Sequence, residues 1–339
     1  FVVPLGDSLV RRRLVPRLLL VAAAALVAAA ASPDVGVLAA AVGVAGACSV
    51  AAQVLVPFSA TLADDASRGR VVGTVMSGLL LGILLARTFA GLVAEAAGWR
   101  AVFVCGAGLV LVTAFLLHRR LPGEVSRPRV VYSQLLWSVL RLFRDEPVLR
   151  LRSALGALAF AAFSVIWTSI AFLLAGPPYR YSEATIGLFG LLGAGGALAA
   201  TTSGRLADRG LERPVTGGSL ALTAGAFGLL ALGRHELLAL VAGVLLADLG
   251  IQAVHIQNQQ LVFAIDPEAR SRLNTSYMVL FFAGGAVGSA TTGAAYAAGG
   301  WTAVVVLGAA YSLAALLVWS LGETTGLGHP AGGRRAART

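Results

Sequence analysis

The feature that most constrains this chain is a series of long runs without a charged residue. About 20 consecutive apolar residues are enough to cross a bilayer as a helix, and the longest run here, 273–322, extends over 50 residues. Backbone polar groups inside a bilayer must be satisfied within the segment, so helices are the expected structure. The runs therefore predict an all-α polytopic membrane protein with ten complete spans, at about 15–33, 36–60, 71–94, 101–118, 153–175, 184–204, 214–232, 237–260, 273–295 and 301–321.

A second feature is an internal repeat with a constant offset of 202 residues. Residues 68–70 recur as 270–272, and the Gly-Trp pair at 98–99 recurs at 300–301. A fixed offset indicates a duplicated unit, and duplicated halves are typical of membrane transporters. The unit that starts at 153 holds six spans and the chain before it only four. We therefore expect about 50 further residues, with one helix and most of a second, before residue 1.

The repeat and the charge pattern divide the chain into four expected segments. In the linker, residues 135, 136, 139, 142 and 143 are apolar and share one helical face, which predicts a helix lying at the cytoplasmic interface. We expect the last long run to be two helices hinged at residues 299–301. The segments are an N-terminal half over 1–118, a cytoplasmic linker with an amphipathic helix over 119–152, a C-terminal half over 153–321 and a cytoplasmic tail over 322–339.

The positive charge is distributed asymmetrically between alternate loops. Apart from Arg87, Arg100, Arg180 and Arg234, all of the 26 basic residues lie on alternate loops or on the tail. The positive-inside rule places those loops and the C-terminus in the cytoplasm, with the chain in the cell (inner) membrane. A nucleic-acid-binding face is not expected, since it would gather its arginines together.

Polar residues inside the spans are the candidates for function. Asp248, Gln252, His255 and Gln259 follow helical spacing within an arc of about 60°, and such a stripe should face the bundle interior or water. Asp248 is the acidic residue within a span, so it is the first candidate for proton coupling, with His255 as a second. Arg87 lies at a similar depth, and we expect it to pair with Asp248. The alternative is that the pair only fixes packing and that His255 is an ordinary hydrogen-bonding partner.

Further residues are expected to line a substrate cavity. Gln53 precedes His255 by the repeat offset, and Ser49 lies one turn before it. Phe163 and Trp167 are one turn apart and would form an apolar wall, although simple packing is an equal alternative. Trp301 and its repeat partner at 99 are expected as interfacial anchors. The sequence predicts no metal site and no cofactor.

One loop resembles a family signature. Residues 204–210 read Gly-Arg-Leu-Ala-Asp-Arg-Gly, followed by Arg213, and the counterpart near the start contains Asp7 and Arg11. This loop is similar to the cytoplasmic signature loop of the major facilitator superfamily, and residues 78–91 resemble a glycine-rich helix of the drug–proton antiporters, with Arg87 in place of a proline. The resemblance implies a cytoplasmic gate formed by Asp7, Arg11, Gly204, Asp208, Arg209 and Arg213, to which we add the repeated arginines Arg70 and Arg272.

The resemblance also implies a fold and a function. The fold would be two six-helix halves, with twelve helices in the full-length protein. The activity would be secondary transport by alternating access, as proton-coupled efflux of a drug or sugar, with protons and a small molecule as partners in the bilayer and a monomer as the unit. An importer, a uniporter or a transport-dead sensor is the alternative. An enzyme is not expected, because no metal-ligand spacing, Ser-His-Asp set or phosphate loop is present.

Overall fold

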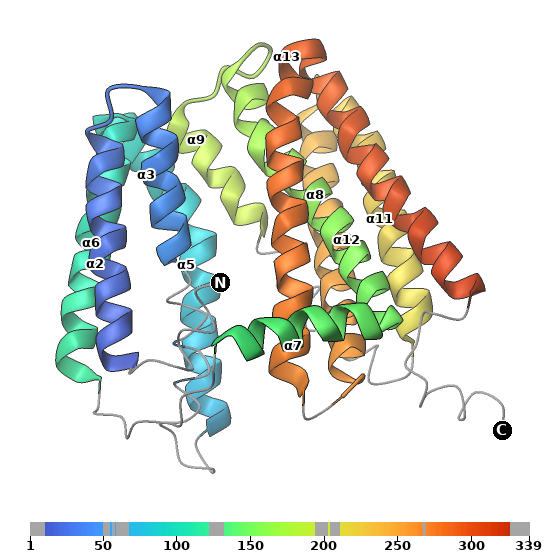
Figure 1. The fold of residues 1–339 in the computed structure, drawn as a ribbon. Helices are drawn as coiled ribbons and strands as arrows, with labels where there is room; N and C mark the ends of the chain where they lie inside the picture. Colours follow the sequence, from blue (N-terminus) through green and yellow to red (C-terminus); the bar gives the residue numbers. More distant parts are fainter. Residues whose placement is uncertain are drawn as a thin grey trace. The chain divides into compact units, whose positions relative to one another are not determined.

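A computed structural model shows an all-helical chain. It describes residues 11–49, 55, 58, 68–121, 132–193, 203, 211–266 and 269–325. Two compact units divide the chain, the first made of Phe1–Leu136 with Ser182–Leu191 and the second of Trp137–Tyr181 with Leu192–Thr339. The helices are arranged as a bundle within each unit (Figure 1).

Within the described residues, the first unit contains four longer helices and one short one. Helix α2 (Arg11–Ala30) packs against α3 (Val35–Cys48) and α6 (Trp99–Arg120). The side chain of Asp34 caps α3 by accepting a hydrogen bond from the Val37 amide at 2.9 Å. The short helix α9 (Glu183–Leu188) lies against α5 (Arg68–Ala97), where glycines at 91 and 187 allow backbone contact. Residues 182–191 therefore join the unit that contains the start of the chain.

The second unit is a bundle of α8 (Pro147–Ala175), α11 (Glu212–Leu232), α12 (Leu237–Phe263) and α13 (Arg270–Thr324). The α8–α13 contact is the most extensive, because Gly284 and Gly288 of α13 lie directly on the backbone of Ala157 and Ala161. Small residues give such close approach between membrane helices. Leu149, Val262, Ala269, Leu273, Tyr277 and Phe281 form a buried apolar cluster at one end of this unit.

Six helical segments of the described chain are long and apolar enough to cross a membrane: Ser77–Ala97, Trp99–Arg120, Pro147–Ala175, Glu212–Leu232, Leu237–Phe263 and Arg272–Thr324. The expected hinge in the last of these is confirmed, because the backbone of Gly299 and Gly300 leaves the helical conformation and Gly300 has a φ of 59°. Two expected spans are described only in part. The span at 36–60 is seen as α3 to residue 48, and the span at 184–204 as α9 and a 3-10 turn, η1 (Phe189–Gly193).

The structure bears on two expectations about orientation. Trp301 is only 5% exposed and its indole donates to the carbonyl oxygen of Leu230 at 2.7 Å, so the expected interfacial anchor is wrong for this residue. The linker contains α7 (Tyr132–Asp145), but Leu142 and Phe143 pack against the buried cluster of the second unit. Part of the expected apolar face of α7 is therefore packed on protein, and the expected place of the helix at the cytoplasmic interface stays a prediction.

Candidate functional site

The candidate site follows one face of α12. Its glycines at 243 and 250 lie against Leu230 and Thr223 of α11. The opposite face of α12 therefore points away from α11. Asp248, Gln252, His255 and Gln259 all lie on this opposite face, and α12 also packs on α8 and α13. The stripe is therefore held within the second unit, on the side that meets α8 and α13.

At one end of the stripe, Asp248 is joined to α8. Its side chain is 3% exposed, and its Oδ1 accepts a hydrogen bond from the indole Nε1 of Trp167 at 3.1 Å. A buried carboxylate requires such donors, because removing a charge from water is costly. Trp167 is half-buried and its ring lies 6.1 Å from that of Phe163. The structure thus brings together the expected proton-coupling residue and the expected cavity wall.

About two turns along α12, His255 is joined to α13. Its Nδ1 lies 3.0 Å from the hydroxyl of Tyr277, and its ring centroid lies 4.4 Å from that of Phe281. Tyr277 is fully buried and sits over Gly156 of α8, where an added Cβ would lie 2.7 Å from the hydroxyl. Tyr277 is a candidate site residue that the sequence does not predict. Its position in an apolar span carries no motif, and only the packing of α13 reveals the contact.

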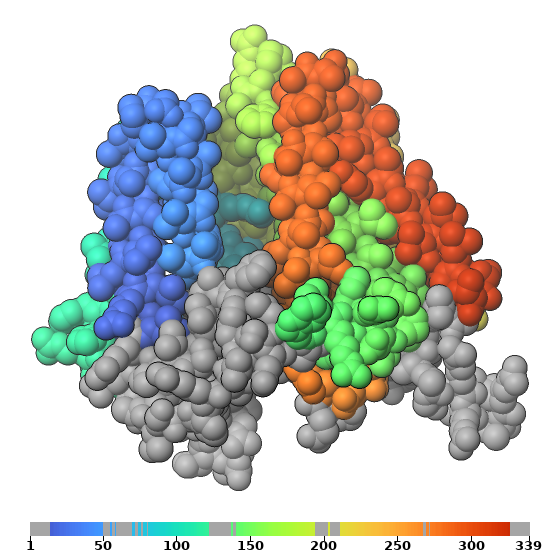
Figure 2. Space-filling model, in the orientation of Figure 1, coloured from blue at the N-terminus to red at the C-terminus, as the bar shows by residue number. Residues whose placement is uncertain are grey.

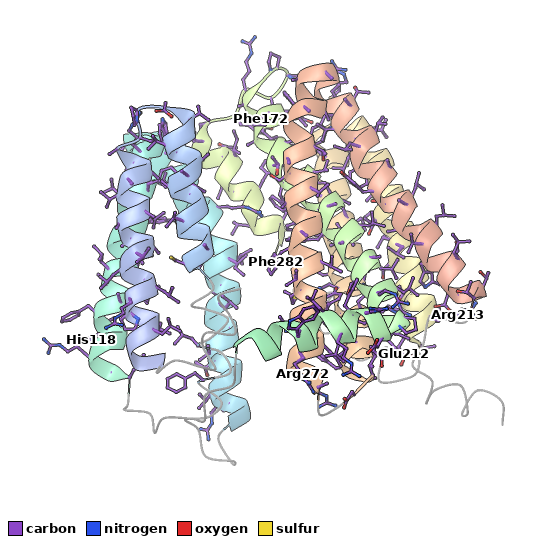
Figure 3. All side chains as sticks on the ribbon, viewed as in Figure 1. His118, Phe172, Glu212, Arg213, Arg272 and Phe282 are labelled. Carbon is purple, nitrogen blue, oxygen red and sulfur yellow. The ribbon has the colours of Figure 1, made fainter. Side chains whose placement is uncertain are left out.

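A row of aromatic rings connects these two polar contacts. Phe160 stacks on Phe163 at 5.3 Å and on Phe281 at 4.1 Å, measured between ring centroids. Phe282 meets both Phe160 and Phe281 edge-on and is 52% exposed (Figure 3). The row runs from Trp167 to His255 across α8 and α13. It gives the site an apolar wall beside the carboxylate and the imidazole.

The remaining cavity candidates occupy different settings. Gln259 donates through Nε2 to Oδ1 of Asn274 at 3.4 Å, and Gln252 is half-buried between His255 and Asp248 along the stripe. Ser49 ends α3 in the first unit, where its hydroxyl donates to the carbonyl oxygen of Ala45 at 3.0 Å. Gln53 lies outside the described residues.

Arg87 belongs to α5 in the first unit, whereas Asp248 belongs to the second. The stem of Arg87 packs on Gly190, where an added Cβ would lie 2.6 Å from the arginine Cβ. The interaction of Arg87 with Asp248 stays a prediction.

Of the expected gate residues, Arg213 has a defined ionic contact. Its Nε lies 3.0 Å from Oε2 of Glu323, while Nη2 of Arg152 lies 3.7 Å from Oε1 of the same carboxylate. Arg152 and Glu323 are both buried, so this carboxylate also compensates a charge that is withdrawn from water. Neither residue is predicted by the sequence, because each lies at the end of an apolar run and resembles an ordinary terminal charge. Figure 3 shows Arg213 and Arg272 at the same end of the second unit.

The other gate residues are described in part. Arg272 is half-buried, and its carbonyl oxygen accepts from the hydroxyl of Ser276 at 3.0 Å. Arg70 is exposed on α5, and its carbonyl oxygen accepts from Thr74 at 2.9 Å. The backbone of Arg11 begins α2. Asp7, Gly204, Asp208 and Arg209 lie outside the described residues. Within the described ranges, no group of three or more His, Cys, Asp or Glu is placed to hold a metal ion.

Comparison with known proteins places this arrangement among transporters. The sequence model of the Major Facilitator Superfamily matches residues 1–263. The uncharacterized transporter YgaY of Escherichia coli K12 is 47% identical over 319 residues, which cover 94% of this chain and 81% of that protein. The transporter SCO4007 of Streptomyces coelicolor is 39% identical over 312 residues, covering 92% of this chain and 72% of that protein.

A solved structure shares the fold. The crystal structure of a bacterial homologue of the human lysosomal transporter Spinster, in an inward-facing and occupied conformation, matches with a TM-score of 0.71. The match covers 92% of this chain and 82% of that one at 16% sequence identity.

Proposed function

Because the chain belongs to the major facilitator superfamily and is a multi-pass membrane transporter rather than an enzyme, we propose that it couples export of a small molecule to proton movement. The substrate class we propose is a hydrophobic drug-like compound or a sugar. Two halves that alternate access to one central site would carry out the transport. The observation that supports this proposal most directly is the hydrogen bond between Trp167 and the buried carboxylate of Asp248.

This contact supplies a physical link between a proton and a substrate wall. A charged carboxylate accepts a hydrogen bond about twice as strongly as a neutral group does. Protonation of Asp248 therefore weakens the hydrogen bond that it accepts from the indole of Trp167, which lies next to Phe163 in the aromatic row. Proton binding would then change the shape of the wall, and a substrate pressed on that wall would change the affinity for the proton.

His255 and Tyr277 extend the same proposal along α12. Their 3.0 Å contact lies on the same face of the helix, about two turns from Asp248. We assign this pair the role of handling the proton between Asp248 and the end of the unit that holds Arg213 and Glu323. Arg87 is the proposed charged partner of Asp248 in one state of the transport cycle.

The test uses purified protein in sealed vesicles with an imposed pH gradient, with ethidium as the drug probe and lactose as the sugar probe. Asp248→Asn should abolish accumulation against a concentration gradient while exchange of probe across the membrane persists, because the substituted side chain cannot release a proton. Asp248→Glu should restore part of the coupling. Asp266→Asn, beyond the end of α12, is the matched control and should behave as the native chain.

Two outcomes would contradict this proposal. Uphill accumulation by Asp248→Asn at the native rate would remove Asp248 from coupling. If the probe accumulates on the side to which protons flow, instead of the side from which they flow, the protein would be a proton-linked importer.

A further inference from the structure

The linker helix α7 has an outward face whose composition is unusual for a surface exposed to water. Trp137 and Leu140 are 71% and 59% exposed, and Arg141 and Arg144 are exposed beside them. At about 100° per residue these four positions fall within roughly one quarter to one third of the helix circumference. Large apolar side chains and arginines therefore share one continuous strip.

The opposite face of α7 is already occupied. Leu142 and Phe143 pack on the buried cluster that contains Leu149 and Tyr277. The guanidinium of Arg150, on α8, also donates to the carbonyl oxygens of Phe143 and Arg144 at the end of α7. These contacts fix the rotation of the helix, so the outward strip cannot turn to bury Trp137 in the protein.

The position of α7 relates the strip to the membrane. Helix α8, which follows it, begins at Pro147 and is long enough to cross a bilayer. Figure 1 shows α7 running across the helices of the second unit near one end, and Figure 3 shows Arg213 and Arg272 at this end. Figure 2 shows α7 on the outer surface beside the start of α8. A helix of 14 residues is too short to span a bilayer, so in this place it would lie at the depth of the lipid headgroups.

We propose that the outward strip of α7 is a lipid-binding face that selects anionic headgroups. Trp137 and Leu140 enter the boundary between headgroups and acyl chains, where an indole has both an apolar surface and a polar edge in suitable surroundings. Arg141 and Arg144 then meet the phosphates, since long arginine side chains extend along the interface to reach charge. Arg141 also forms an exposed ion pair with Asp145 at 3.3 Å, and such a surface pair contributes little free energy, so it does not keep this guanidinium from a phosphate. The positive charge of the strip favours an anionic lipid surface as its partner rather than an apolar protein surface.

The measurement uses Trp137 itself as the reporter. The protein is placed in vesicles of phosphatidylcholine with a fixed fraction of phosphatidylglycerol. In one sample the phosphatidylglycerol carries bromine, which quenches tryptophan, and in the other an equal mole fraction of the phosphatidylcholine carries it. The difference in quenching between the native chain and Trp137→Phe isolates the contribution of Trp137. We expect brominated phosphatidylglycerol to quench this contribution about fivefold more effectively, the factor expected for one arginine at an anionic surface.

A charge variant and its control test the selection. Arg141→Gln with Arg144→Gln should make the two brominated lipids equally effective, whereas Arg234→Gln, on the loop before α12, should leave the preference unchanged. If the double variant does not fold, about 1 M salt should remove the preference in the native protein, because it shortens the range of charge attraction to about 3 Å.

Three results would overturn the proposal. Equal quenching of native Trp137 by both lipids would remove the headgroup selection. Absence of quenching by either lipid would place the strip in water. Trp137 fluorescence that responds to the protein-to-lipid ratio but not to bromine would make the strip an interface with a second copy of this chain.

Discussion

At the scale of single residues, the hydroxyl of Tyr277 offers the sharpest separation of transport from packing. Tyr277→Phe keeps the ring that fills the space over Gly156 but removes the contact with His255. Loss of one such hydrogen bond costs about 1 kcal/mol of stability, so the protein should still fold. We expect proton-driven transport in vesicles to fall several-fold with little change in the midpoint of thermal unfolding.

A second tyrosine on the same helix provides the control. Tyr311 lies 3.1 Å from the hydroxyl of Thr291, away from the α12 stripe. Tyr311→Phe should lose a similar amount of stability and leave proton-driven transport intact. Equal loss of transport in the two variants would show that Tyr277 acts through the packing of α13 alone.

At the scale of helices, the close approach of α8 and α13 should depend on glycine at defined positions. A Cβ at Gly284 would overlap the carbonyl group of Ala157, so Gly284→Ala must separate the two backbones. Overpacking of this kind costs about 1–3 kcal/mol, and we expect a lower unfolding temperature in detergent and less folded protein.

The control substitution lies in the same helix. Gly293 has no atom within 4 Å of its Cβ position within the part of the chain described. Gly293→Ala should be neutral or stabilise the helix by about 0.4–1 kcal/mol, because alanine has fewer unfolded conformations to lose. A Gly284→Ala variant as stable as Gly293→Ala would show that α8 and α13 do not touch there.

The same helices show what the sequence is able to predict. Long uncharged runs located the spans, and helical spacing placed Asp248, His255 and Gln259 on one face of α12, because both depend only on neighbours along the chain. The partners came from elsewhere. Tyr277, Arg152 and Glu323 reach the site through the packing of α13 against α8 and α12, and no local pattern marks them.

Where the sequence failed, a tertiary contact overruled a local preference. A tryptophan after a glycine at a helix start is typical of a membrane interface, yet Trp301 is buried because its indole reaches the free carbonyl oxygen of Leu230 near the end of α11. In α7, Leu142 and Phe143 pack on the buried cluster of the second unit, a contact that the amphipathic pattern does not reveal.

At the scale of the whole molecule, the arginine distribution makes a prediction about the two sides of the membrane. The exposed Arg144 lies just before the start of α8. Arg213 lies at the start of α11, and the exposed His235 lies just after its end. Because each helix is long enough to cross the bilayer, its two ends must lie on opposite sides. The positive-inside rule then places Arg144 in the cytoplasm and His235 outside.

Labelling of single cysteines in intact cells tests this arrangement. In a chain with Cys48→Ala and Cys105→Ala, a maleimide that cannot cross membranes should label His235→Cys in intact cells, and should label Arg144→Cys only after the cells are opened. Labelling of both positions in intact cells would place the start of α8 and the α11–α12 loop on the same side. Three crossings, by α8, by the span expected at 184–204 and by α11, would not allow this. The reverse pattern would keep the spans but invert the chain. The lipid strip of α7 would then face the outer leaflet.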